Sequence, residues 1–221
     1  MDVKTLGVVG SGQMGSGIAQ VAASSGLKVV LQDISKDSLA AAKKRIDSSL
    51  NKLVEKGKMS ADDCSNAQKN IYYTEHLEEL SRADVVVEAV SENLAVKYEI
   101  FKKLDAICRD EVILATNTSS ISITSIASKT SRPEKVVGMH FMNPVPIMKL
   151  VEIIRGLQTS QESFDAVKSL SSRMGKICVE SKDYPGFVVN RILMPMINEA
   201  CYALFEGLAS AEDIDNAMKL G

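Results

Sequence analysis

The amino-acid sequence predicts an α/β fold: a doubly wound, mostly parallel sheet followed by the start of an all-helical second domain. Up to about residue 183, short apolar runs alternate with helical patterns, as in a parallel sheet covered by helices on both faces. A glycine-rich turn joins the first apolar run to the first helix. From residue 184 the pattern is helical only. We therefore divide the chain into residues 1–183 and an incomplete second region, 184–221.

The glycine-rich turn has the spacing G-x-G-x-x-G at Gly10, Gly12 and Gly15, between an apolar run and a helix that starts at Gln13. Gly10 permits a tight turn, Gly12 allows a pyrophosphate to approach the backbone, and Gly15 lets the helix pack closely on the strand. Free N–H groups at the helix N-terminus favour phosphate.

An acidic residue follows at the distance that a dinucleotide site requires. Asp33 ends the second strand, residues 28–32, and lies 18 residues after Gly15, where an acid that binds the ribose hydroxyls is expected. The whole context favours dinucleotide binding in a Rossmann-type sheet over a purely structural turn.

The other elements follow from caps, glycine stops and apolar periodicity. Ser35 and Ser60 are predicted helix caps, and Gly26, Gly57 and Gly175 end helices. Further strands are predicted at 71–74, 83–90, 112–115, 136–141, 149–154 and 177–180, and helices at 13–25, 35–56, from 60, 93–109, 121–128, 161–174, 187–206 and from 210.

Composition excludes several classes of protein. The net charge of −2 implies no basic surface for nucleic acid. The four cysteines lie far apart, which argues for reduced thiols and against a zinc site. No apolar run approaches the roughly 20 residues of a membrane helix. Because the chain runs directly into its first strand, we expect a cytoplasmic protein, or a mitochondrial or peroxisomal one if a targeting segment has been removed.

Two histidines are the candidates for a catalytic base. His76 lies in an acidic turn, where a surface histidine is favoured. His140 ends an apolar strand, and a chain reversal around Pro146 places it opposite Glu152. A carboxylate beside an imidazole fixes its tautomer and stabilises the imidazolium. From the residues alone, the pair is either catalytic or a structural salt bridge.

Polar residues at two other places are candidate ligands. Asn117 and Ser119 close a strand and either bind a ligand or cap the next helix, with the cap favoured for Ser120 and Ser122. Asn190 lies in the long apolar helix after the turn at 183–186, and there it needs a protein, water or ligand partner.

Five segments together resemble the L-3-hydroxyacyl-CoA dehydrogenase family, including the bacterial 3-hydroxybutyryl-CoA dehydrogenases. They are GSGQMGSGIAQ, VVEAVSENLAVK, ATNTSSISIT, GMHFMNPVPIMKLVEII and DYPGFVVNRIL. The similarity runs from residue 5 to the last residue, and HFMNPVPIMKLVE and PGFVVNR are its most specific parts. The resemblance implies NAD-dependent, reversible oxidation of the 3-hydroxyl group of an acyl-CoA.

The resemblance also implies roles for individual residues. His140 matches the catalytic base, Glu152 the acid that orients it, and Ser119 and Asn190 the residues that hold the reacting oxygen. Ser49 and Lys56 match positions near the CoA adenosine. The implied NAD-site residues are Gly10, Gly12, Gln13, Met14, Gly15, Asp33, Glu92, Lys97, Asn117, Ser119 and Asn143, and no metal is implied.

One departure from the family and two alternatives remain. Family members continue beyond AMKLG through helices that complete the second domain and much of the dimer interface, so the homodimer expected of the family is left open here. A 3-hydroxyisobutyrate-type dehydrogenase would use a lysine near the linker helix, but none lies between Pro185 and Lys219. A crystallin-like structural protein would bind NAD without turnover, and the His140–Glu152 pair argues against it.

Overall fold

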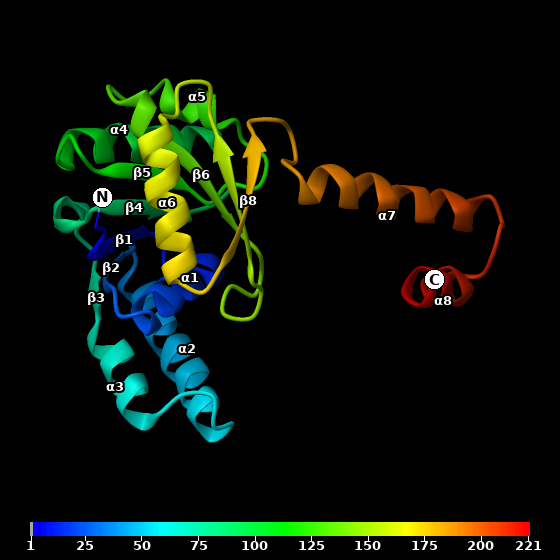
Figure 1. The fold of residues 1–221 in the computed structure, drawn as a ribbon, viewed down its shortest axis with the longest axis horizontal. Helices are drawn as coiled ribbons and strands as arrows, with labels where there is room; N and C mark the ends of the chain where they lie inside the picture. The colour runs from blue at the N-terminus through cyan, green and yellow to red at the C-terminus, as the bar shows by residue number, and fades with distance from the viewer. Residues whose placement is uncertain (1) are drawn as a thin grey trace.

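The computed structural model describes residues 2–221 and consists of a single sheet between helices, from which the last two helices project (Figure 1). The strands are β1 (Thr5–Val9), β2 (Lys28–Gln32), β3 (Ile71–Thr74), β4 (Val85–Glu88), β5 (Ile113–Thr116), β6 (Val136–Phe141), β7 (Leu150–Arg155) and β8 (Ile177–Lys182). The α-helices are α1 (Gln13–Ser24), α2 (Lys36–Glu55), α3 (Ala61–Lys69), α4 (Leu94–Ile107), α5 (Ile123–Ala127), α6 (Gln161–Arg173), α7 (Val189–Phe205) and α8 (Ala211–Leu220), and the 3₁₀ helices are η1 (Leu77–Arg82) and η2 (Pro133–Lys135).

The strand order is β3-β2-β1-β4-β5-β6-β7-β8, which confirms the doubly wound sheet. Strands β1 to β6 are parallel, β7 is antiparallel to β6, and β8 is parallel to β7. The chain moves outward from β1 in one direction as far as β3 and then returns to continue from β4 on the other side. The carboxyl ends of β1, β2 and β4 therefore meet at a switch point, where ligands bind in sheets of this kind.

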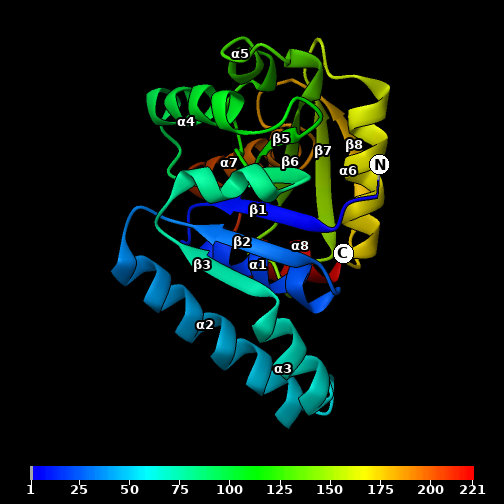
Figure 2. The same ribbon diagram turned by 90° about the vertical axis from the view of Figure 1, so that its left-hand side faces the viewer.

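Apolar side chains fill both faces of the sheet. In β4, Val85 and Val87 belong to one core and Val86 to the other, because successive strand residues point to opposite faces. Helices α1, α2, α3 and α6 cover the first core, and η1, α4 and α5 cover the second. Helices α4 and α6 accordingly lie on opposite sides of the sheet in Figure 2.

Several predicted boundaries are wrong by a few residues. The strand expected over 83–90 is confined to Val85–Glu88. Just before it, the Asp84 carboxylate accepts hydrogen bonds from the N–H groups of Lys4 (2.8 Å) and Thr5 (2.9 Å). The two 3₁₀ helices were not predicted, since such short segments have no helical periodicity. Helix α7 starts at Val189 and not at Phe187, which has a left-handed backbone with φ of 50°.

A carboxylate joins the end of β8 to helix α5. Asp183 accepts hydrogen bonds from Ser122 Oγ (2.8 Å) and from the N–H groups of Ile123 (2.9 Å) and Thr124 (2.8 Å). Burial raises the pKa of Asp183, but these hydrogen bonds outweigh it and leave the pKa below its ordinary value. Ser122 also caps α5 as predicted, whereas Ser120 does not and directs its hydroxyl to Glu92 at 3.4 Å.

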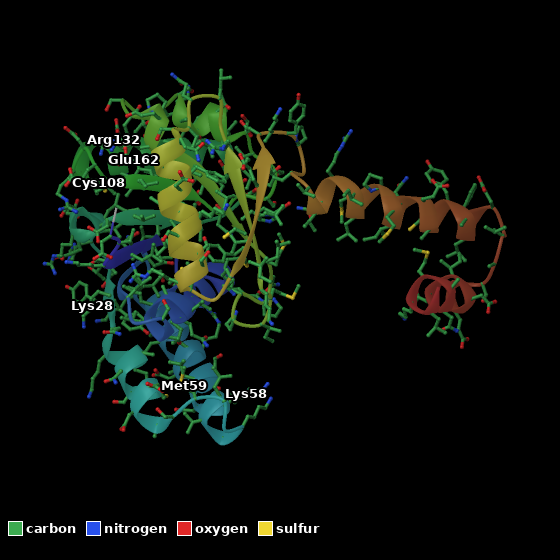
Figure 3. All side chains as sticks on the ribbon, in the orientation of Figure 1. Lys28, Lys58, Met59, Cys108, Arg132 and Glu162 are labelled. Carbon is green, nitrogen blue, oxygen red and sulfur yellow. The ribbon has the colours of Figure 1, made fainter. Side chains whose placement is uncertain are left out.

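Helices α7 and α8 contribute no buried residue. Figure 3 shows their side chains extending from a ribbon that stands apart from the sheet. Ile192 on α7 is 64% exposed and Phe205 is 86% exposed. Across residues 2–221, the structure contains no helix with the length and apolar character needed to span a membrane.

Candidate active site

The glycine turn after β1 is shaped by close backbone contacts. Gly10 has a φ of 91°, and a Cβ on Gly15 would lie 1.8 Å from the Gly10 carbonyl oxygen. A Cβ on Gly12 would meet no atom within 4 Å, so the space above Gly12 is open at the N-terminus of α1. Glycine at these three positions thus leaves room and N–H donors for a phosphate group, which is the fit that a dinucleotide requires.

A cleft of about 1000 Å³ adjoins this turn at the ends of β1, β2 and β4. Asp33 lines the cleft, and both of its carboxylate oxygens accept hydrogen bonds. Its Oδ2 accepts hydrogen bonds from Ser11 N (2.7 Å) and Ser11 Oγ (2.8 Å), and its Oδ1 accepts one from Ser35 N (3.0 Å). The carboxylate predicted to bind a ribose is therefore fixed beside Gly10 and Gly12, which line the same cleft.

Other residues of this cleft were not predicted from the sequence. They include Leu77, Val90 and Ile34, and the Ile34 side chain is 90% exposed. His76, expected to be a plain surface residue, is exposed but also lines the cleft. Strand order could have located it, because β3 pairs in parallel with β2 and the residues after β3 must lie beside those after β2.

Lys97 and Glu88 form a buried ion pair between α4 and the end of β4. Their Nζ and Oε1 atoms are 2.7 Å apart, and Thr116 Oγ1 donates to Glu88 Oε2 at 2.7 Å. Pairing with Glu88 offsets the cost of removing the Lys97 charge from water. Lys97 is only 1% exposed, and its ammonium group also lies 3.3 Å from Oε2 of the half-exposed Glu92.

Glu92 in turn holds Ser119. Its Oε1 accepts hydrogen bonds from Ser119 N (2.8 Å), Ser119 Oγ (3.2 Å) and the Thr118 hydroxyl. Burial raises the pKa of Glu92, but the hydrogen bonds from Thr118 and Ser119 and the charge of Lys97 outweigh it, so the pKa is below its ordinary value. The predicted residues Glu92, Lys97 and Ser119 therefore form one connected group.

Two asparagines tie the loops around His140 to the sheet and to α1. Asn117 Oδ1 accepts a hydrogen bond from Phe141 N at 2.9 Å, which joins the end of β5 to the end of β6. Asn143 Oδ1 accepts one from Gln13 Nε2 at 2.9 Å, next to the glycine turn. These contacts bring the loop after β6 to the first turn of α1.

His140 and Glu152 face each other across β6 and β7, which confirms the predicted register. His140 Nδ1 lies 2.7 Å from Glu152 Oε2, and both side chains are buried. Because Nδ1 faces a carboxylate, Nε2 is the ring nitrogen left to exchange a proton with a ligand. The Phe187 ring packs edge-on against His140, with ring centroids 5.7 Å apart.

The second oxygen of Glu152 binds the start of α7. Oε1 accepts hydrogen bonds from Val188 N and Val189 N, each at 2.9 Å. Gly186, with a φ of 80°, and Phe187 turn the chain so that these N–H groups point at the carboxylate. Burial raises the pKa of Glu152, but the hydrogen bonds from His140, Val189 and Val188 outweigh it and hold the pKa below its ordinary value.

The remaining predicted residues are more scattered. Asn190 follows Val189 in the first turn of α7 and is half-buried. Met14 is half-buried and packs against the core. Ser49 accepts a hydrogen bond from Gln20 at 2.9 Å, and Lys56 is exposed at the end of α2, so neither lines the cleft.

Over residues 2–221, no three acidic, cysteine or histidine side chains come together in an arrangement that could hold a metal ion.

Comparison with known proteins gives a consistent result. Residues 5–184 match the family model described as the NAD binding domain of 3-hydroxyacyl-CoA dehydrogenase, and residues 186–221 match its C-terminal domain. A probable 3-hydroxybutyryl-CoA dehydrogenase of Bacillus subtilis is 52% identical over 221 residues, covering 100% of this chain and 77% of that protein. The human mitochondrial hydroxyacyl-coenzyme A dehydrogenase is 47% identical over 99% of this chain and 72% of its own length.

The solved structures agree. The crystal structure of (S)-3-hydroxybutyryl-CoA dehydrogenase from Ralstonia eutropha superposes with a TM-score of 0.98 at 50% identity, over 100% of this chain and 78% of that one. The fold, the glycine turn and the cleft thus define an NAD-binding oxidoreductase of the Rossmann class. Within that class, the chain belongs to the 3-hydroxyacyl-CoA dehydrogenase family.

Replacing Glu152 by Gln is expected to lower the free energy of unfolding at neutral pH by about 1–3 kcal/mol, because an amide cannot satisfy all three donors. The folded-state pKa of Glu152 lies below its ordinary value of 4.5, so its stabilising effect is complete above that value and is lost as the pH falls through the folded-state pKa. Urea denaturation should therefore show a gap between wild type and Glu152→Gln that narrows in acid. Glu162→Gln, which alters an exposed residue of α6 labelled in Figure 3, is the control. A gap that stays constant with pH would contradict the pKa shift.

Proposed function

We propose that the protein interconverts L-3-hydroxyacyl-CoA and 3-ketoacyl-CoA with NAD as cofactor, and that it acts on short acyl chains such as 3-hydroxybutyryl. The observation that carries the proposal is the His140–Glu152 pair, buried, in register and anchored to the start of α7. The names of the relatives in Bacillus subtilis and Ralstonia eutropha support the short-chain substrate.

In this proposal His140 is the general base and accepts the proton of the 3-hydroxyl group at Nε2. Glu152 holds the tautomer and stabilises the imidazolium that forms. Ser119, oriented by Glu92, and Asn190, in the first turn of α7, hold the reacting oxygen. Bound NAD supplies the hydride acceptor.

The cofactor and CoA contacts follow from the placement of the other residues. Gly10, Gly12 and Gly15 leave space for the pyrophosphate, and Asp33 accepts hydrogen bonds from the ribose. Gln13, Met14, Glu92, Lys97, Asn117 and Asn143 complete the proposed NAD site, and Ser49 and Lys56 the CoA adenosine site. We place the enzyme in the cytoplasm, consistent with its widely separated cysteines.

We also propose a domain boundary after residue 183 and a homodimer formed through α7 and α8. These helices contribute no buried residue, and their exposed apolar side chains include Phe205 and Leu208. Exposed apolar surface of this kind marks a site of association. The relatives from Bacillus subtilis and Ralstonia eutropha are longer than this chain, which covers 77% and 78% of them.

His140→Gln should lower turnover of acetoacetyl-CoA with NADH by about 100- to 10,000-fold, because general-base catalysis contributes a factor of that size. NADH affinity, measured by fluorescence titration, should change little, since the glycine turn is untouched. The assignment is wrong if His140→Gln keeps near wild-type turnover and His76→Gln, at the only other histidine, abolishes it.

The wild type should prefer NADH to NADPH, because the Asp33 carboxylate binds ribose hydroxyls and repels a 2′-phosphate. Asp33→Ser should reduce the ratio of kcat/KM for the two cofactors by about tenfold or more, as expected for removal of one close like charge. Asp37→Ser, at an exposed position in the first turn of α2, is the control. Equal use of NADPH by the wild type would contradict the role of Asp33.

Sedimentation equilibrium should show a mass that rises with protein concentration as the apolar faces of α7 and α8 associate. Phe205→Glu should weaken the association by about tenfold or more, since buried aromatic side chains dominate interface energies. Glu199→Gln, at an exposed polar position of α7, should leave it unchanged. A monomer at every concentration would contradict the proposed dimer.

A further inference from the structure

Lys176 is a buried lysine that the proposed mechanism does not use. It immediately precedes β8 and is 8% exposed. Its Nζ donates hydrogen bonds to the carbonyl oxygens of Val145 (2.5 Å) and Met148 (2.8 Å). Burial lowers the pKa of Lys176, as expected for an ammonium group without a carboxylate partner. The two carbonyls therefore compensate for the desolvation of its charge.

Both carbonyls belong to the segment 142–149, which connects the strand of His140 to the strand of Glu152. The segment carries little apolar packing at its tip, where Ile147 is 73% exposed. Its internal hydrogen bonds run from the N–H groups of Ile147 and Met148 to the Pro144 carbonyl. Lys176 thus holds the segment from outside, through one carbonyl on each side of the exposed residue Ile147.

The same segment packs against helix α1. Val145 is buried, and a Cβ on Gly17 would lie only 2.8 Å from Val145 Cβ, so the loop and helix are in close contact. One turn earlier in α1, Gln13 bonds to Asn143. Because α1 starts at the glycine turn, the position of segment 142–149 is coupled to the shape of the proposed NAD site.

We propose that Lys176 is a positioning residue for NAD: its ammonium group holds segment 142–149 against α1 and so keeps Asn143 beside the glycine turn. The inference rests on the proposed function only for the identity of the ligand. Lys176 acts through backbone carbonyls and does not contact the reacting atoms. Its loss should therefore weaken cofactor binding more than it lowers turnover at saturating NADH.

The test compares Lys176→Met, which keeps the length of the side chain and removes the charge, with Lys182→Met at an exposed position of β8. In the cofactor-free protein, hydrogen exchange at the Ile147 and Met148 amides should accelerate in Lys176→Met, while the central strands stay protected. NADH should bind about tenfold more weakly by fluorescence titration, the size expected for losing a charged hydrogen-bond donor. Lys182→Met should match the wild type in both measurements.

A rescue experiment separates positioning from general loss of stability. In Lys176→Ala, added propylammonium should restore NADH affinity by occupying the vacated space and donating to the same carbonyls, whereas 1-propanol should not. If the smaller side chains prevent folding, Lys176→Arg keeps the charge and donors and should hold NADH within about threefold of the wild type.

The possible outcomes are distinct. A wild type that binds NADH, together with a Lys176→Met variant that binds it equally well, overturns this inference alone. Faster hydrogen exchange in segment 142–149 without weaker NADH binding also overturns the inference. Lys176 would then hold the segment without affecting the cofactor. A wild type that binds no NADH overturns both the inference and the proposed function.

Discussion

The candidate site depends on the hydrogen bonds that the Glu152 carboxylate accepts. One oxygen meets His140 Nδ1, and the other accepts the N–H groups of Val188 and Val189. Burying a carboxylate is costly unless its oxygens are satisfied, and here three donors satisfy it. The orientation of the imidazole and the direction in which α7 leaves the sheet are consequently fixed by the same group.

Three other carboxylates are satisfied in a similar way. Asp33, Glu92 and Asp183 each accept backbone N–H groups at the end of a strand or the start of a helix. Such N–H groups have no partner within the regular structure, so a carboxylate satisfies them and gains hydrogen bonds that favour its ionised form. The apolar core makes the sheet rigid, and these carboxylates set the positions of the loops that follow its strands.

Two buried lysines hold neighbouring groups through their ammonium groups. Lys97 is neutralised by Glu88 and Glu92, and so supports the carboxylate that orients Ser119. Lys176 donates hydrogen bonds to two backbone carbonyl groups and holds a loop. Burial lowers the pKa of Lys176, because removal from water disfavours its charged form.

Local sequence determined the alternation of strands and helices, the glycine turn after β1 and the position of Asp33 after β2. It also determined the register that pairs His140 with Glu152. Periodicity and turn chemistry act over a few residues, so these features can be read locally. Only the tertiary structure decided how Glu152 meets Val188, 36 residues away, through the left-handed turn at Phe187. It likewise decided the burial of Lys97 and Lys176. Contacts of this kind leave no repeating pattern in the sequence. They depend on where separate elements end once the helices have packed on the two faces of the sheet.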